Sequence, residues 1–313
     1  MLTPFENCAP GRFTFWMPPQ GYTVAVGPEQ IAVPLPALPL PLHRAEATGE
    51  TPGDAAIGQG VYDYLRQFPD CQGNRTYAAL LRDAYPHFLT DLASYAVMVD
   101  AKQVEPAYVL RKLNCLKVLS LLEPDNTELL LQLSRGFLAV ALEFSELAYC
   151  RRHLRDAMRY GQEALRVEPA SAGALSVLAE IDLLFGDTPG AIDKWRRLAG
   201  LIGDPVLQAR IDEQVAALAE GEIPDSCLVD DLEALAEAMQ LHTRGDHAQA
   251  VYILEQIQEA GRLTAKLPSA DFYWLLGVCR RADGDVGGAY SALLKATELE
   301  PGHAAAIDAL ASL

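Results

Sequence analysis

The chain has 313 residues, half of them apolar, and its 42 acidic and 25 basic side chains give a net charge of −17. This length and apolar content are typical of one long array or two domains with substantial cores, and do not indicate disorder. The acidic surplus is greatest in residues 201–313, which carry 19 acidic and 7 basic side chains. It argues against general nucleic-acid binding, which needs positive charge.

The first 15 residues lack the basic start and apolar core of a secretory signal. Residues 31–42 are apolar but contain four prolines, so they are too short and too interrupted to insert into a membrane as a helix. The six cysteines lie far apart and form no Cys-x-x-Cys pair, as is typical of reduced thiols. We therefore expect a cytoplasmic protein without membrane insertion.

Residues 1–53 are predicted to form a proline-rich arm with short strands. Residues 12–16 and 22–26 have strand composition, and the Pro-Pro-Gln-Gly sequence at 18–21 predicts a turn between them. Residues 31–42 alternate proline with apolar residues, which favours an extended, polyproline-like strap. We expect this arm to lie on an apolar groove. The alternative is a proline-rich ligand for another protein.

From residue 54 onward the apolar spacing is helical. Three further regions are predicted: short helices in 54–85, helical hairpins in 86–220, and repeats with a C-terminal capping helix in 221–313. The expected elements are helices 55–67 and 75–84; hairpins 86–122, 126–167 and 171–200; an unpartnered helix 205–220; hairpins 228–260 and 270–299; and a capping helix from residue 303. A Gly-Glu-Ile-Pro break at residues 221–224 predicts a weak joint between two sub-arrays.

The motif Gly-Asp-x-x-x-Ala occurs three times, beginning at Gly186, Gly245 and Gly284. Each copy lies between two apolar helical patterns, so each predicts the turn of a helical hairpin. Glycine can adopt the left-handed conformation that ends the first helix. The aspartate can accept hydrogen bonds from the free N–H groups that open the second helix. A small alanine one turn later permits close helix packing.

Residues 270–301 resemble a tetratricopeptide repeat (TPR) over the full length of that motif. The matching residues are Tyr273, Leu276, Gly277, Gly284, Ala289, Leu293, Ala296 and Pro301, while Arg280 replaces the usual tyrosine. Residues 175–203 match nearly as well, and residues 234–262 match mainly in their second half. Upstream the resemblance weakens, because the hairpin of residues 126–167 is about eleven residues too long for the repeat. The resemblance covers residues 86–313 and is specific in about half of them.

The resemblance implies an all-α, right-handed, TPR-like solenoid of helical hairpins. It also implies a protein-interaction module that binds a peptide or helix of a partner protein in its concave groove, as an adaptor, scaffold or assembly factor. The alternative is an accessory subunit of an enzyme complex in which residues 1–85 contribute their own site. A purely structural part of a homo-oligomer is a third possibility.

The same resemblance places particular side chains of each first helix in the concave groove. These are Leu131, Gln132, Arg135, Val177, Glu180, Met239, His242, Trp274 and Arg281. Several are large and apolar, which is typical of a binding surface. The alternative is that Leu131, Met239 and Trp274 are buried against the N-terminal arm.

Four arginines, Arg151, Arg152, Arg155 and Arg159, follow one helix face. Arginine binds carboxylate or phosphate through paired hydrogen bonds, so this face is a candidate anion or carboxylate site. The simpler interpretation is a solvated face that acidic residues of neighbouring turns partly neutralise.

The sequence predicts no enzyme, cofactor or metal site. The pair Gly58 and Gly60 lacks the context of a phosphate-binding loop and is interpreted as a joint between a loop and a helix. No nucleophile elbow or His-Glu-x-x-His motif occurs in the sequence. His242 and His247 are five residues apart across a turn, and we interpret them as surface histidines.

Overall fold

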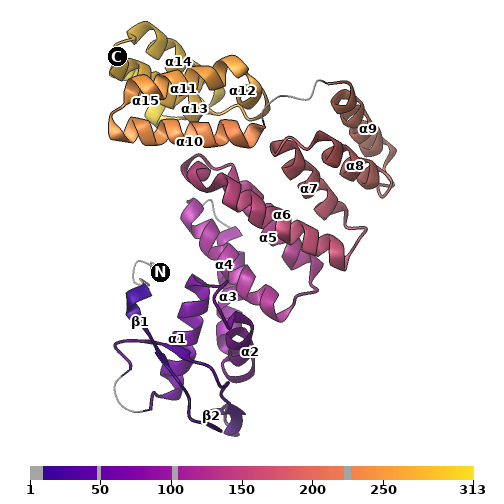
Figure 1. Ribbon diagram of the computed structural model, residues 1–313, viewed down its shortest axis with the longest axis vertical. Helices are drawn as coiled ribbons and strands as arrows, with labels where there is room; N and C mark the ends of the chain where they lie inside the picture. The colour runs from indigo at the N-terminus through magenta and orange to yellow at the C-terminus, as the bar shows by residue number, and fades with distance from the viewer. Residues whose placement is uncertain (1–9, 48–50, 101–104, 222–226) are drawn as a thin grey trace. The chain divides into compact units, whose positions relative to one another are not determined.

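The computed structural model describes residues 10–47, 51–100, 105–221 and 227–313. It divides into an N-terminal unit, Met1–Gly136, and a C-terminal unit, Phe137–Leu313. Both units are mainly helical, so the predicted all-α helical-repeat class is confirmed (Figure 1). In the part of the chain described, no helix is both long and apolar enough to cross a membrane. The right-handed winding stays a prediction.

The N-terminal unit begins with short strands and continues with helices. Its elements are η2 (Pro10–Arg12), β1 (Phe13–Trp16), β2 (Thr23–Val26), β3 (Ile31–Pro34), β4 (Leu40–His43), α1 (Asp54–Gln67), α2 (Asn74–Ala84), α3 (Pro86–Asp100), α4 (Pro106–Leu122) and most of α5 (Thr127–Ala141). Helices α3 and α4 each begin with a proline, a residue that suits the first position of a helix. The predicted helices of residues 55–122 are thus confirmed.

The C-terminal unit consists of successive helices. They are η3 (Phe144–Tyr149), α6 (Cys150–Val167), α7 (Ala172–Leu184), α8 (Thr188–Ala199), α9 (Pro205–Glu220), α10 (Leu228–Arg244), α11 (His247–Ala260), α12 (Arg262–Lys266), α13 (Ala270–Asp283), α14 (Val286–Leu299) and α15 (Ala304–Ala311). Helices α7 and α8, α10 and α11, and α13 and α14 pack as pairs, and α15 packs on the last of them.

The strands pair differently from the expectation. The turn before Tyr22 is present, with the Tyr22 N–H donating to the Pro19 carbonyl at 3.0 Å, but the strands on its two sides do not pair. Instead β1 pairs antiparallel with β4, and β2 with β3. The predicted strap is therefore extended but folds back into two small sheets. Its prolines are tolerated because every strand of a two-stranded sheet is an edge strand.

Strand β4 packs against α1 and anchors the N-terminal segment. Leu40 and Leu42 are buried with Ile57 and Val61 of α1 in one apolar core. The Tyr77 hydroxyl also donates to the Pro39 carbonyl at 2.6 Å. Val24, Leu40 and Leu42 of the arm thus belong to the core of the N-terminal unit. The described ring contacts of Trp274 are with Phe144 and His303.

Gly58 and Gly60 lie inside α1, so the interpretation of a joint between a loop and a helix was wrong. A Cβ atom on Gly60 would lie 2.3 Å from the Pro41 carbonyl oxygen, and one on Gly58 would lie 2.6 Å from the Tyr85 ring. Both glycines are mid-helix because other segments approach the helix backbone too closely for a side chain. Sequence spacing carries no sign of such a long-range contact.

The helix predicted over residues 126–147 ends early, at Ala141, and η3 follows it. No proline or glycine marks this end. Leu142 and Glu143 donate backbone bonds to residues three positions earlier, and η3 packs on α10. Tertiary packing thus overrides the continuous helical pattern, and the extra residues of this hairpin form a separate turn.

The three Gly-Asp turns have the predicted geometry. Gly186, Gly245 and Gly284 have φ values of 79°, 84° and 97°, and the alanine one turn later is fully buried in each copy. The Asp187 carboxylate accepts from the Gly190 N–H at 3.0 Å, and Asp285 accepts from Gly288 at 2.9 Å. In the second turn Asp246 accepts at a longer distance, from the Gln249 N–H at 3.4 Å.

Helix α9 was expected to lack a partner, and this was wrong. Val215 is buried with Trp195 and Leu198 of α8. The predicted weak joint at residues 221–225 lies outside the described residues except for Gly221. Contacts between the flanking parts nevertheless exist, because α10 packs on η3, α6 and α7. The expectation of few contacts across the joint was therefore also wrong.

We expect a glutamate-specific protease to cut the native chain first after Glu220 or Glu222, because a Gly-Glu-Ile-Pro sequence interrupts the helical pattern there. Because α10 packs on the preceding helices, the two pieces should stay together and co-elute in size-exclusion chromatography. Mass spectrometry of the digest locates the cut. Early cutting elsewhere, or separation of the pieces without denaturant, would contradict this expectation.

Candidate functional site

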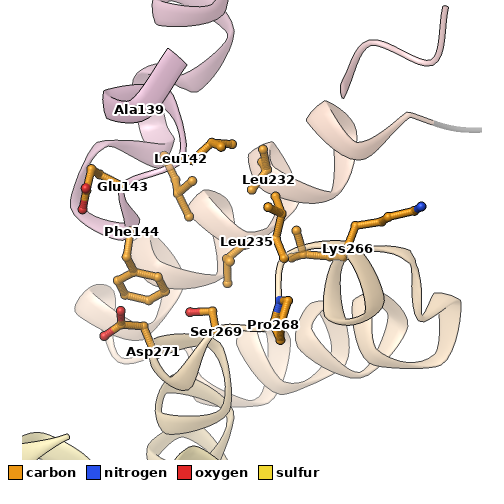
Figure 2. A pocket seen from close by; sticks show the side chains of 13 residues that line it. Ala139, Leu142, Glu143, Phe144, Leu232, Leu235, Lys266, Pro268, Ser269 and Asp271 are labelled. Carbon is orange, nitrogen blue, oxygen red and sulfur yellow. The ribbon is translucent and has the colours of Figure 1, made fainter. Parts of the chain in front are cut away.

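A pocket of about 390 Å³ lies in the C-terminal unit, where the end of α5, η3, α10, α12 and the start of α13 meet (Figure 2). Its size falls in the range of ligand-binding clefts. It is lined by Ala139, Leu142, Glu143, Phe144, Leu147, Leu232, Leu235, Leu263, Lys266, Leu267, Pro268, Ser269 and Asp271. Eight of these residues are leucine, phenylalanine or proline, so the walls are mainly apolar.

The walls of the pocket come from segments that interrupt the repeat. Residues 142–149 add η3 between α5 and α6, and residues 261–269 add α12 between two hairpins. Leu232 and Leu235 lie three residues apart on α10 and so share one helix face. The sequence signal for this site was the extra length of the hairpin of residues 126–167, which sequence reasoning registered only as a departure from the repeat.

Charged and polar groups surround the apolar walls. Figure 2 shows Glu143, Phe144 and Asp271 at one side of the pocket and Lys266 at the opposite side. The Asp271 carboxylate lies 3.0 Å from His303 Nε2. Ser269 caps α13, and its hydroxyl accepts from the Phe272 N–H at 3.3 Å. The pocket thus has an acidic end and a basic end.

Trp274 lies beside this pocket. Its ring contacts Phe144 edge-on, with centroids 6.5 Å apart, and His303 at 6.3 Å. The side chain is half-buried and follows Asp271 by one turn of α13. Because Phe144 is a lining residue, Trp274 extends the aromatic edge of the pocket.

The nine predicted groove residues have mixed environments, and none of them lines the pocket. Leu131 and Val177 are each only 6% exposed and so offer a partner little surface. Met239, His242 and Trp274 are half-buried. The exposed members are Gln132, Arg135, Glu180 and Arg281. Binding through these residues stays a prediction.

The arginine face on α6 is partly occupied by carboxylates of the chain itself. Arg151 donates to Glu233 at 2.7 and 2.8 Å and to Asp230 at 3.0 Å, and these bonds raise the pKa of its guanidinium. Arg159 donates to Asp156 at 3.0 Å and lies over the Tyr160 ring. Arg152 and Arg155 are exposed. An anion site on this face stays a prediction that rests mainly on those two residues.

His242 and His247 do not behave as two independent surface histidines. Both are half-buried, their ring centroids lie 5.2 Å apart, and the buried Cys279 lies beside them. The sequence interpretation as surface histidines did not include their contact with each other and with Cys279. It missed the convergence because Cys279 comes from α13, a different hairpin.

No family model matches the chain, and no curated protein matches it significantly. Similar solved structures include one of MamA protein, with 16% identity over 68% of this chain and 92% of that one, and a TM-score of 0.32. Another is a tetratricopeptide repeat protein from Parabacteroides merdae, with 13% identity, 82% and 91% coverage and a TM-score of 0.29. A third is the APC/C hetero-tetramer Cut9–Hcn1, with 15% identity, 81% and 56% coverage and a TM-score of 0.26.

These global similarities are low. The turns and close helix contacts of this chain support a TPR-like helical-repeat fold more directly. Left-handed glycines, capping aspartates and buried alanines recur in the α7–α8, α10–α11 and α13–α14 hairpins. The chain therefore has a TPR-like helical-repeat fold.

Proposed function

We propose that the protein is an interaction module whose C-terminal unit binds a short apolar segment of a partner protein in the pocket of Figure 2. The carrying observation is the apolar lining of this open cavity. Burying apolar surface is the main favourable term in protein association. A fold of helical hairpins supports such a function but does not identify the partner.

The charges around the pocket indicate the chemistry of the bound segment. Glu143 and Asp271 favour a basic side chain at their end of the pocket, and Lys266 favours an acidic one at the other. A short amphipathic helix with two or three large apolar side chains on one face would fill the cavity. Phe144 and Trp274 provide the aromatic surface that often dominates such binding.

The sequence also left open a site within residues 1–85. Several polar groups in this region form hydrogen bonds between separate segments of the fold. The Tyr85 hydroxyl donates to the Asp54 carbonyl at 2.8 Å, and His43 Nε2 lies 2.9 Å from Asp63. Burial raises the pKa of Tyr62 to about 12. We therefore base the proposed function on the pocket of the C-terminal unit and not on a site in residues 1–85.

The test is a peptide-display selection on the intact protein. We expect enriched peptides to share an apolar face and a basic end. Their binding should weaken about tenfold or more in Leu142→Asp, because a bound apolar segment would remove water from the new aspartate carboxylate. Leu142 is half-buried, so the unbound protein should tolerate the change. Fluorescence anisotropy of labelled peptides measures the affinities.

The matched control is Leu294→Asp, which places the same charge on an exposed leucine of α14 that does not line the pocket. This variant should bind the selected peptides as the unmodified protein does. Glu143→Lys should lower the affinity of peptides with a basic end and leave that of neutral ones nearly unchanged. Failure to enrich any peptide, or equal binding by Leu142→Asp, would contradict the proposed function.

A further inference from the structure

Three potential metal ligands converge in the C-terminal unit, away from the residues that line the pocket. His242 lies in the last turn of α10, His247 begins α11, and Cys279 is on α13. One ligand atom from each residue lies within 4.8 Å of the others. Cys279 Sγ and His242 Nδ1 are 3.4 Å apart.

These separations suit a tetrahedral transition-metal ion. Zinc–sulfur bonds of about 2.3 Å and zinc–nitrogen bonds of about 2.0–2.1 Å place neighbouring sulfur and nitrogen ligands roughly 3.5 Å apart. The Cys279–His242 pair already has nearly this spacing. Because all three ligand atoms lie within 4.8 Å of one another, the set can surround a single ion.

The local fold explains why the ligands meet. Gly245, with a φ of 84°, turns the chain sharply after α10, and Asp246 then caps α11. His242 and His247 therefore face each other across the turn, although they belong to different helices. Helix α13 packs on α11 and places the fully buried Cys279 beside the two histidines.

The site also contains a polar atom without a partner. Among the described residues, His247 Nδ1 is buried and makes no hydrogen bond. Buried polar atoms usually have a hydrogen-bond partner. A buried ring nitrogen without one is therefore a candidate metal ligand.

We propose that His242, His247 and Cys279 bind a zinc-like divalent transition-metal ion, with the fourth position open to water. Nitrogen and sulfur ligands select this class of ion over Mg²⁺ or Ca²⁺, which prefer oxygen. As the metal–sulfur bond forms, the thiol proton leaves to solvent.

Metal binding at this point has a structural consequence. The ligands come from both helices of one hairpin and the first helix of the next, so the ion cross-links consecutive repeats. A ligand that binds only the folded protein raises its melting temperature. The bound ion should therefore stabilise the hairpins from α10 to α14.

The experiment titrates the untagged full chain, stripped of metal, with Co²⁺ and then displaces it with Zn²⁺. We expect one Co²⁺ per chain, with thiolate-to-cobalt charge-transfer absorption and the visible bands of a tetrahedral site. Cys279→Ser keeps the size of the side chain and should abolish the charge-transfer band. His247→Ala should weaken Co²⁺ affinity about tenfold or more.

Matched controls separate loss of ligands from loss of structure. Cys115→Ala changes another fully buried cysteine, and His87→Ala removes an exposed histidine of the N-terminal unit. Both should bind Co²⁺ as the unmodified protein does. Circular-dichroism melts without metal establish that each variant is folded. Zn²⁺ should raise the melting temperature of the unmodified protein by clearly more than that of His247→Ala. Absence of one-to-one binding, or unchanged binding in His247→Ala and Cys279→Ser, would overturn the proposal.

Discussion

Replacing Gly277 by leucine is expected to destabilise the C-terminal unit by about 3 kcal/mol, at the upper end of typical overpacking costs. Helix α13 lies close to α14 at this residue. A Cβ atom there would lie 2.5 Å from Leu293 Cγ and 3.2 Å from the Ala289 carbonyl oxygen. Leu293 is fully buried and cannot move aside without disturbing the core.

This net figure already includes the higher helix propensity of leucine, which favours the variant by about 0.8 kcal/mol. In a unit of this size the net loss lowers the melting temperature by roughly 6–12 °C. Calorimetry or circular dichroism measures the shift. The matched control is Gly287→Leu in α14, where a Cβ would meet only an aspartate oxygen at 3.9 Å. Equal melting temperatures for both variants would show that the α13–α14 contact is misassigned.

The second large effect is expected for Gly60→Ala in α1. The added Cβ would lie 2.3 Å from the Pro41 carbonyl oxygen and 2.9 Å from Leu42 Cα. Both are backbone atoms, so β4 as a whole must move away. Alanine gains about 1 kcal/mol of helix propensity, and we expect the clash to exceed this and give a net loss of about 2 kcal/mol.

Hydrogen exchange followed by mass spectrometry is the sharpest readout for Gly60→Ala. Amides of β1 and β4 should exchange faster, because their sheet is held on α1 through β4. Gly53→Ser is the matched control at the start of the same helix. A Cβ on Gly53 meets nothing within 4 Å, and serine is a better N-cap, so this change should preserve or increase stability. Slower or unchanged exchange in Gly60→Ala would contradict the packing of β4.

Local sequence signals predicted the hairpins well. The conformations of Gly186, Gly245 and Gly284 and the caps that follow them depend on residues within a few positions along the chain. Helix α9 was predicted from Pro205 to Glu220, with the same bounds as in the structure. The sequence did not predict its packing on α8, because Val215 alone is fully buried on this helix, whereas Ile211 and Leu218 are only partly buried.

Features that depend on distant residues were not predictable from local pattern. The pairing of β1 with β4 joins segments about 25 residues apart, and proline composition alone favoured a strap. The partners of Arg151 are Asp230 and Glu233, whereas the sequence offered only acidic residues of neighbouring turns. The pocket and the His–Cys cluster are likewise formed by residues from several helices.

The proposed binding of a partner segment in the pocket is tested most directly by site-specific photo-crosslinking. A photoreactive phenylalanine analogue at Phe144 keeps an aromatic ring at the pocket edge, and the same analogue at Tyr252, an exposed residue of α11, is the control. With a peptide from the selection, crosslinking at residue 144 should modify the apolar face of the peptide, as read by tandem mass spectrometry. It should be much weaker at residue 252. Equal crosslinking at both positions, or crosslinking only at residue 252, would contradict binding in the pocket.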